Sequence, residues 1–286
     1  MEHISLRSFE PRDVEPCGRI CYEAFASIAQ RHGFPHDLPN AEVAAGMLSF
    51  LLETQGFYGV VAERDGVVAG SNWLDERNAV AGVGPITVDP AVQDAGIGRR
   101  LMQDVIARAE GRGITEMRLV QLAYHARSLS LYTKLGFASR EELVVLSGVP
   151  DDPQLRGYSV RPIEPDDLMP CNRLCESVYG FHRGGELLTA LSGPNAFVAV
   201  RGGAIRAYTS GLGYFGHTVG GTTESICALL ALAPHMPSPG VIVPVRDYPI
   251  FRWCLDHGMR AVLTMTLMSR GPYHAPNGPY LPSVVY

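Results

Sequence analysis

A glycine-bearing segment in the first half of the chain has the residue types that bind anions. With the two residues after it, the segment reads Gln93-Asp94-Ala95-Gly96-Ile97-Gly98-Arg99-Arg100. Gly96 and Gly98 carry no side chains that would block an approaching phosphate, and glycine tolerates unusual backbone angles. The first N–H groups of a helix that opens at this loop have no partners within the helix, and the helix dipole is positive there. The segment therefore predicts a pyrophosphate site.

The residues around this loop predict the elements that hold it in place. A β-branched run over 82–88 indicates a strand that enters a turn at Asp89-Pro90. Residues 98–110 have the periodicity of a helix, which two glycines would end. A Rossmann dinucleotide site would need a third glycine at the position of Leu101, and its strand order would differ.

A second motif follows at the end of a predicted helix over 128–135. It reads Leu131-Tyr132-Thr133-Lys134-Leu135-Gly136-Phe137. The two segments resemble the Gln/Arg-x-x-Gly-x-Gly/Ala loop and the closing Tyr-x-Lys-Leu-Gly-Phe segment of the GNAT superfamily of N-acetyltransferases. The resemblance covers residues 1–150 and implies an α/β fold with a mixed sheet. It also implies acetyl-coenzyme A as the donor cosubstrate, with no metal.

The resemblance implies which residues would touch this cosubstrate. Backbone groups of Ile86, Thr87 and Val88 would pair with the pantetheine arm like an additional strand. Backbone N–H groups of the loop would hold the pyrophosphate, and they belong to Gln93, Asp94, Ala95, Gly96, Ile97, Gly98 and Arg99. His125 occupies a position where relatives often carry an asparagine that touches the cofactor, and Ser128 is compatible with the family pattern.

The same resemblance supplies an acid for the reaction but leaves the base open. Tyr132 would face the sulfur atom and protonate the departing thiolate, unless its ring is only a core aromatic. The nucleophile would be a neutral amine, which must lose a proton to a base or to water. Asp75 and Glu76 follow the third predicted strand, near where acceptors lie in this family, so either is a candidate base. Exposed carboxylates are more often plain solvated charges.

Two groups of metal-ligand residue types have plainer explanations. Four cysteines could suggest a zinc site, namely Cys17, Cys21, Cys171 and Cys175. Each pair has the spacing of one helical turn, and the two pairs lie in separate halves, which favours buried small side chains. His32 and His36 have metal-like spacing, but Pro35 would break the helix that aligns them.

An internal repeat divides the chain into two halves. The segment Arg7-Ser8-Phe9-Glu10-Pro11-Arg12-Asp13 recurs 154 positions later as Arg161-Pro162-Ile163-Glu164-Pro165-Asp166-Asp167. The sequence thus predicts two tandem acyl-CoA N-acyltransferase (GNAT-like) domains, a catalytic one over 1–150 and a degenerate one over 157–286. Each would start with a strand, an acidic-proline turn and a helix. In the first half we expect helices over 13–30 and 41–53, and strands over 3–9, 59–64, 67–73, 116–121 and 143–147, with a hairpin at Asp65-Gly66.

The second half is expected to keep the scaffold and to lack the cofactor site. No glycine loop precedes its helical segment over 224–230, where Glu224 would repel a pyrophosphate. Cys254 takes the place of Tyr132 in the closing motif. We interpret this half as a structural domain that shapes the acceptor cleft, with its tail tyrosines packed back on the core.

Composition excludes several classes of protein. With 46% hydrophobic and 19% charged residues, the 286-residue chain is not disordered. A net charge of −5 without a basic run argues against nucleic-acid binding. The longest apolar stretch, 226–233, is far shorter than the ~20 residues of a membrane helix, and the first residues lack the pattern of a signal peptide. Because the cysteines are sparse, we expect a cytoplasmic protein with reduced thiols.

These features predict an N-acetyltransferase that transfers acetyl from acetyl-coenzyme A to a primary amine by direct attack in a ternary complex. A non-catalytic acyl-coenzyme A binding or sensing protein is the alternative, since it would have the same loop and no clear base. A small amine, an antibiotic, a peptide N-terminus and a lysine side chain are all open as acceptors. The oligomeric state is open as well.

Overall fold

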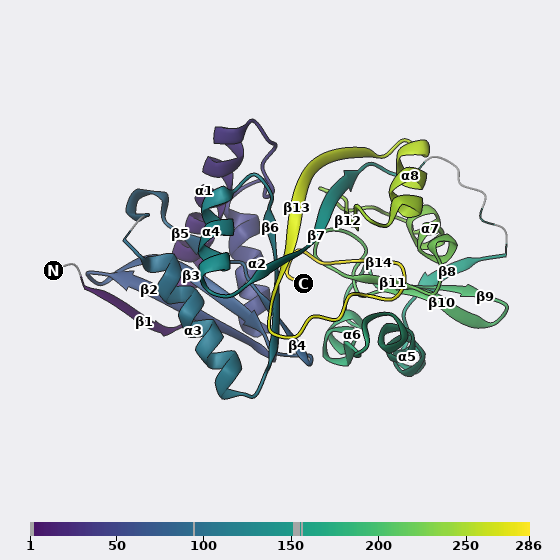
Figure 1. Ribbon diagram of the computed structural model, residues 1–286, viewed down its shortest axis with the longest axis horizontal. Coiled ribbons are helices and arrows are strands. Elements are labelled where there is room, and N and C mark those ends of the chain that lie inside the picture. The colour runs from purple at the N-terminus through teal and green to yellow at the C-terminus, as the bar shows by residue number, and fades with distance from the viewer. Residues whose placement is uncertain (1–2, 94, 151–154, 156) are drawn as a thin grey trace. The chain divides into compact units, whose positions relative to one another are not determined.

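The computed structural model describes residues 3–93, 95–150, 155 and 157–286, which cluster into two compact units. The first unit contains the chain up to Leu119, Tyr124–Phe137 and Val285. The second contains Val120–Ala123, Ala138–Val284 and Tyr286. Figure 1 shows the elements of both units. Within the described ranges, no helix has both the length and the apolar character needed to cross a membrane.

The first unit is built on a mixed sheet. Its elements are β1 (Ile4–Ser8), η1 (Pro11–Asp13), α1 (Val14–His32), α2 (Ala41–Glu53), β2 (Phe57–Arg64), β3 (Val67–Asp75), β4 (Val80–Val83), β5 (Thr87–Val88), η2 (Pro90–Val92), α3 (Ile97–Gly111), the first four residues of β6 (Glu116–Leu122) and α4 (Ala126–Lys134). The strand order is β1-β2-β3-β4-β6, with β5 also beside β3. All pairs are antiparallel except β4 with β6, which run parallel.

Alternating side chains of β3 show that helices cover both faces of this sheet. Trp73 is buried in a cluster with Cys17 of α1 and Leu48 of α2. Successive side chains of a strand point to opposite faces, so the neighbouring Asn72 lies on the other side. There its amide donates a hydrogen bond to the carbonyl oxygen of Leu101 in α3, at 3.3 Å. Helices α1 and α2 therefore cover one face, and α3 covers the other.

The hairpin between β2 and β3 confirms the turn predicted from Asp65-Gly66. Both residues have positive φ angles, of 51° and 81°. Such angles at both central residues are typical of the tight turn that matches the twist of two antiparallel strands.

The single strand predicted over 82–88 is divided in the structure. Leu74 of β3 pairs with Val83, whereas Ser71 pairs with Thr87. Between these pairs β3 has two residues and the opposite chain has three, which is the arrangement of a β-bulge. β4 pairs with β6 on its other side, but in the described sheet β5 has no strand partner other than β3. The bulge thus leaves one edge of β5 open.

The second unit contains two groups of antiparallel strands. Its elements are β7 (Ala138–Ser147), β8 (Ser159–Pro162), η3 (Pro165–Asp167), α5 (Leu168–Tyr179), α6 (Gly184–Ala190), β9 (Phe197–Arg201), β10 (Ala204–Thr209), β11 (Thr218–Gly220), α7 (Thr223–Leu232), β12 (Val241–Pro244), α8 (Tyr248–Asp256), β13 (Arg260–Arg270) and β14 (Tyr280–Leu281). One group has the order β14-β11-β10-β9-β8, and β7 lies between β13 and β12 in the other. Tyr280 and Tyr286 are buried, as expected for a tail packed on the core.

The two halves start with the same local structure, which confirms the strand, turn and helix predicted at each start. The guanidinium of Arg7 donates to both carboxylate oxygens of Asp13, at 2.6 and 2.7 Å. That of Arg161 donates to both oxygens of Asp167, at 2.6 and 2.8 Å. Each aspartate also accepts the backbone N–H three residues before it, at 2.8 Å. The repeated residues therefore build the same buried turn twice.

Strand β7 belongs to the first half by sequence and to the second unit by structure. It pairs antiparallel with β12 through Leu143–Leu146 and with β13 along its whole length. β13 in turn lies beside the end of β6, where the Ala123 N–H donates to the Thr264 carbonyl at 3.1 Å. Within this unit, β7 of the first half thus pairs with strands of the second half, and β13 of the second half lies beside β6 of the first. The compact units therefore divide the chain differently from the sequence repeat.

Candidate functional site

The predicted glycine loop precedes α3 and leaves the start of that helix uncapped. Gly96 is the N-cap residue, with φ 79° and ψ 4°, and no side chain there accepts an N–H of the first turn. An L-residue rarely adopts this left-handed conformation, which is why glycine suits the position. Ile97 is buried behind the turn, whereas Gly96 is exposed. The first N–H groups of α3 are therefore available to an anion.

The second glycine of the loop lies where three elements meet. A Cβ atom added to Gly98 would come within 3.6 Å of Leu131 in α4 and 3.7 Å of Val88 in β5. These are ordinary van der Waals distances, so a side chain could start here without strain. The contacts place the start of α3, the open edge of β5 and the flank of α4 together, as the predicted site requires.

The residues before the loop are held by local hydrogen bonds. Asp89 donates its N–H to the carbonyl of Ala69 at 2.9 Å, and its carboxylate accepts the N–H of Ala91 at 2.8 Å. Thr87 is buried, while Ile86 and Val88 are partly exposed along β5. The backbone that the family resemblance assigns to the pantetheine arm therefore follows a fixed path beside β3.

Arg127 is a cation at this site that the sequence reasoning missed. Its guanidinium donates to the side-chain oxygen of Gln93 at 3.1 Å, and the Gln93 amide donates to the Val88 carbonyl at 3.3 Å. Arg99 is exposed beside the loop, whereas Arg100 donates to the carbonyl of Ile4 at 2.9 Å and so reaches toward β1. The sequence signal that could have identified Arg127 is a basic residue in the first turn of α4.

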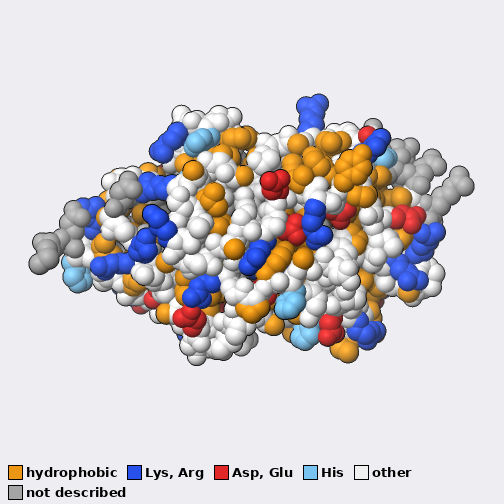
Figure 2. Space-filling model, in the orientation of Figure 1, with side chains coloured by type: hydrophobic (Ala, Val, Ile, Leu, Met, Phe, Trp, Pro, Cys, Tyr) orange, Lys and Arg blue, Asp and Glu red, His pale blue; other side chains and the backbone are white. Residues whose placement is uncertain are grey.

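The surface around the start of α3 is positively charged. Figure 2 shows Lys and Arg side chains gathered on this part of the face, where Figure 1 draws the beginning of α3. Ala95 is partly exposed next to Gly96. Asp94 lies outside the described residues. Of the residues predicted to hold the pyrophosphate, Gln93 and residues 95–99 are described. They form one short segment beside Arg127.

Three of the predicted residues lie along one side of α4, with His125 as the residue before its first turn. Positions 125, 128 and 132 recur at helical spacing, and the Ser128 hydroxyl lies 2.8 Å from Nδ1 of His125. Burial raises the pKa of Tyr132 to about 12, although a hydrogen bond with Ser128 opposes the rise. Burial also lowers the pKa of His125 to about 4, helped by the charge of Arg127. At neutral pH, Tyr132 therefore keeps its proton and His125 is uncharged.

The two candidate bases are buried in ion pairs rather than solvated. Asp75 accepts from the guanidinium of Arg77 at 2.6 and 2.8 Å. Glu76 accepts from Arg108 at 2.7 and 3.1 Å, and Arg112 lies 3.3 Å from it. Both carboxylate side chains are only 5% exposed. Their oxygens are already occupied, which argues against either as a proton acceptor.

The metal-ligand residue types are dispersed in the structure. All six cysteines are buried as free thiols, and Cys17 and Cys21 lie in α1 while Cys171 and Cys175 lie in α5. His32 and His36 make separate ring contacts, with Tyr124 at 5.2 Å and with Tyr22 at 6.2 Å. Over the described ranges, His, Cys, Asp and Glu side chains form no group of three or more that could hold a metal ion.

The corresponding helix of the second half starts with its own side-chain caps. The Thr222 hydroxyl accepts the N–H of Ser225 at 3.2 Å, and the Ser225 hydroxyl accepts the N–H of Thr222 at 3.2 Å. A Cβ atom on Gly220 would lie 2.6 Å from Ile226, so this turn is closely packed. Cys254 is fully buried in α8, at the position that aligns with Tyr132.

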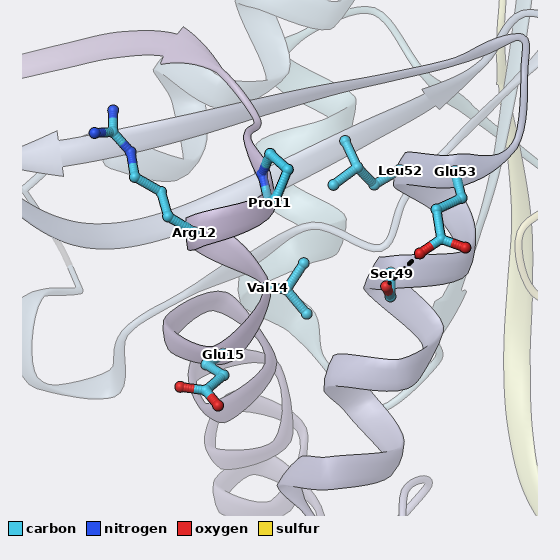
Figure 3. A pocket seen from close by; sticks show the side chains of 7 residues that line it. All are labelled: Pro11, Arg12, Val14, Glu15, Ser49, Leu52 and Glu53. Carbon is cyan, nitrogen blue, oxygen red and sulfur yellow. Dashed lines mark hydrogen bonds between the residues drawn. The ribbon is translucent and has the colours of Figure 1, made fainter.

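A surface hollow elsewhere in the first unit has none of these features. Figure 3 shows it between the start of α1 and the end of α2. Its volume is about 510 Å³. Its lining residues are Pro11, Arg12, Val14, Glu15, Ser49, Leu52 and Glu53. The Ser49 hydroxyl donates to Glu53 at 3.0 Å, and Arg12 pairs with Glu10 at 2.8 Å. No predicted site residue lines this hollow.

Comparison with known proteins agrees with the geometry of the first unit. Residues 20–137 match the family described as "Acetyltransferase (GNAT) family". The mycothiol acetyltransferase of Amycolatopsis mediterranei is 30% identical over 148 residues, which cover 48% of this chain and 47% of that protein. The matched family region contains β5, the glycine loop, α3 and α4. Residues 20–137 of this chain are thus similar to the GNAT family.

Solved structures resemble the chain over almost its whole length. A Pyrococcus horikoshii protein classed as an acetyltransferase has a TM-score of 0.72 at 17% identity, over 94% of this chain and 89% of its own. A GCN5-related N-acetyltransferase from Sphaerobacter thermophilus has a TM-score of 0.60 at 15% identity, over 95% and 96%. At such identities the likeness shows the fold alone. By sequence, the chain spans about half the length of the curated relatives it matches.

Proposed function

We propose that this protein is an N-acetyltransferase that transfers acetyl from acetyl-coenzyme A to a primary amine by direct attack in a ternary complex. The observation that carries the proposal is the uncapped start of α3 at Gly96, placed against the open edge of β5 and the flank of α4. This arrangement lies within the segment that matches the GNAT family. A helix start with free N–H groups suits a pyrophosphate.

The residues at this turn fit the chemistry of the proposed cosubstrate. The N–H groups of residues 93–99 would hold the pyrophosphate, with Arg127 and Arg99 adding positive charge nearby. The backbone of Ile86, Thr87 and Val88 would pair with the pantetheine arm, since an open strand edge offers unpaired donors and acceptors. His125 and Ser128 would lie along the same side of α4.

Tyr132 is proposed as the acid of the reaction. Bound acetyl-coenzyme A supplies a thioester, whose carbonyl carbon bonds to the amine nitrogen as the carbon–sulfur bond breaks. Tyr132 donates its phenolic proton to the sulfur, and it holds that proton at neutral pH because burial raises its pKa to about 12. Ser128 is partly exposed, so it can return a proton to the phenolate and take another from water, and Nδ1 of the neutral His125 lies 2.8 Å from its hydroxyl.

The second half is proposed as a degenerate GNAT-like domain with a structural or substrate-shaping role. Its repeated Arg161–Asp167 turn supports common ancestry with the first half. The capped start of α7 and the buried Cys254 support the loss of a cofactor site. We propose one acetyl-coenzyme A per chain on these grounds.

A non-catalytic acyl-coenzyme A binding or sensing protein is a second candidate. The ion pairs of Asp75 and Glu76 favour it, because neither carboxylate is free to take a proton from an amine. Release of free thiol from acetyl-coenzyme A, measured with a panel of primary amines, separates the two. Amine-dependent release supports the transferase. Binding of acetyl-coenzyme A without release for any amine supports the sensor.

A further inference from the structure

The backbone of Val88 faces the open edge of β5 rather than β3. The N–H of Asp89 donates to the carbonyl of Ala69 at 2.9 Å, and Val88 lies opposite Gly70 in the same register. Neighbouring residues of an antiparallel strand direct their backbone groups to opposite edges. The N–H and the carbonyl of Val88 therefore point away from β3, to the edge of β5 that pairs with no other strand among the described residues.

The side chain of Gln93 connects this edge to the cation on α4. Its amide N–H donates to the Val88 carbonyl oxygen at 3.3 Å, and its amide oxygen accepts from the guanidinium of Arg127 at 3.1 Å. Gln93 is partly exposed, and Arg127 is exposed. All three residues belong to the first unit. Both polar atoms of one amide are thus engaged at the proposed cofactor site, one with the strand edge and one with a cation.

These two bonds have the same polarity as the contacts proposed for acetyl-coenzyme A. An amide N–H of the pantetheine arm would donate to an edge carbonyl, as the Gln93 amide does. A phosphate oxygen would accept from a guanidinium, as the Gln93 oxygen does. The phosphate is the stronger acceptor of the two, since its charge is opposite to that of Arg127. The Gln93 side chain therefore makes, in weaker form, one bond of each kind that the cofactor would make.

Other contacts hold the ends of the loop in place. Before the loop, the Asp89 carboxylate accepts the N–H of Ala91 at 2.8 Å, and the Asp89 N–H is bonded to β3. After it, Ile97 is buried in the first turn of α3. The two bonds of Gln93 are longer than those of Asp89, and N–H···O bonds most often measure about 2.9–3.0 Å. The Gln93 side chain is therefore the weakly held part of this segment.

We propose that the Gln93 side chain is a stand-in for the cofactor, which coenzyme A displaces from the Val88 carbonyl and from Arg127. The two displacements are linked, because one amide makes both bonds. When a pantetheine N–H takes the Val88 carbonyl, Gln93 loses one of the two contacts that fix its amide, and its hold on Arg127 weakens. Gln93 thereby couples the pantetheine end of the site to the phosphate end. This inference rests on the proposed binding of acetyl-coenzyme A.

The test is calorimetry of coenzyme A binding to the full-length protein and to its variant Gln93→Ala. Removal of the stand-in should tighten binding by about three- to tenfold, since the hydrogen bonds of Gln93 no longer have to be replaced. A side chain that only supports the loop, or that contacts the cofactor, would give the opposite sign. Gln103→Ala is the matched control, because it removes an exposed amide from α3 and should leave the affinity unchanged. Circular dichroism checks that both variants are folded.

Two fragments of coenzyme A, pantetheine and ADP, test the coupling. Saturating pantetheine should raise the affinity of the wild-type protein for ADP by at least about twofold, and this coupling should disappear in Gln93→Ala. Unchanged or weaker coenzyme A binding by Gln93→Ala would overturn the inference while wild-type binding still supports the proposed function. Equal coupling in both proteins would overturn it as well. A wild-type protein that binds no coenzyme A would contradict the proposed function itself, and the inference with it.

Discussion

Helices α3 and α7 follow corresponding strands in the two halves, but their first turns are built in opposite ways. α3 begins after Gly96, which offers no side chain to its N–H groups. α7 begins after Thr222, whose hydroxyl and that of Ser225 satisfy the turn reciprocally. A capping box uses the backbone donors that an anion would need. The same position in one fold therefore leaves the first N–H groups uncapped in one half and caps them in the other.

The charges near the two helix starts also have opposite signs, positive near α3 and negative in the first turn of α7. Arg99 and Arg127 lie near the start of α3, with Arg127 bonded to Gln93. Glu224 lies in the first turn of α7 and pairs with Arg201 at 3.0 Å. A carboxylate at a helix start stabilises that helix through its dipole and repels a phosphate. The first turn of α7 thus carries a charge that stabilises a helix start, whereas basic residues lie near the start of α3.

The aligned helices α4 and α8 differ in what their buried residue can reach. Tyr132 is buried but bonded to Ser128 on the helix face that leads to His125. Cys254 is enclosed in an apolar cluster with Ile250. Burial raises the pKa of the Cys254 thiol to about 12, so it stays protonated. A buried acid is useful only where polar neighbours connect it to a reacting group.

The largest effect is expected from a charge at the start of α3. Gly98→Glu should weaken acetyl-coenzyme A binding by at least about a hundredfold, because a carboxylate would occupy the place of the pyrophosphate. Calorimetry measures this, with Gly98→Gln as a control of similar size without charge. In either variant the Cβ atom at position 98 would make only ordinary van der Waals contacts, so both variants should fold. Wild-type protein should bind one acetyl-coenzyme A per chain, and two equivalent sites would contradict the contrast between α3 and α7.

Removal of the Tyr132 hydroxyl should affect turnover rather than binding. Tyr132→Phe is expected to lower kcat by roughly ten- to a thousand-fold, near the range for loss of a general acid. The ring still packs on Phe137, whose centroid is 6.3 Å away, so the fold should persist. Steady-state kinetics and calorimetry on the same protein separate kcat from cofactor affinity. An unchanged kcat, with chemistry shown to be rate-limiting, would make Tyr132 a structural residue.

Local sequence signals predicted the parts of the fold that depend on neighbouring residues. The bounds of α2 agree with the helix expected over 41–53, and the Asp65-Gly66 turn has the predicted backbone. The glycine loop could be placed before α3 because strand, turn and helix follow one another directly. These features are set within a few residues by backbone angles and hydrophobic period.

Features that depend on distant residues were not predictable in this way. The bulge that divides residues 82–88 depends on the register against β3, and β7 pairs with β12 and β13 from far along the chain. The ion pair of Glu76 with Arg108 joins residues 32 positions apart, which turned an apparently solvated carboxylate into a buried one. Periodicity carries no information about such long-range pairing.

The capping box of α7 can be removed without touching the proposed site. Thr222→Ala should lower the free energy of unfolding by about 1 kcal/mol, the typical value of an N-cap. Urea unfolding followed by circular dichroism measures the change, and acetyl-coenzyme A affinity should stay the same. Ser225→Ala, which removes the other half of the box, is a parallel test. A gain of acetyl-coenzyme A binding in either variant would show that the caps alone had closed a functional site.

The smallest effect is expected at Cys254, the counterpart of Tyr132. Cys254→Ala removes one buried sulfur atom from the cluster around Ile250, so the free energy of unfolding should fall by about 1 kcal/mol or less. Turnover with a primary amine should stay within about twofold of wild type, since a thiol in an apolar core can neither give nor receive a proton during the reaction. Urea unfolding and steady-state kinetics measure both quantities on one preparation. A loss of turnover as large as that of Tyr132→Phe would mean that α8 takes part in catalysis, and the second half could then no longer be described as a scaffold without a site.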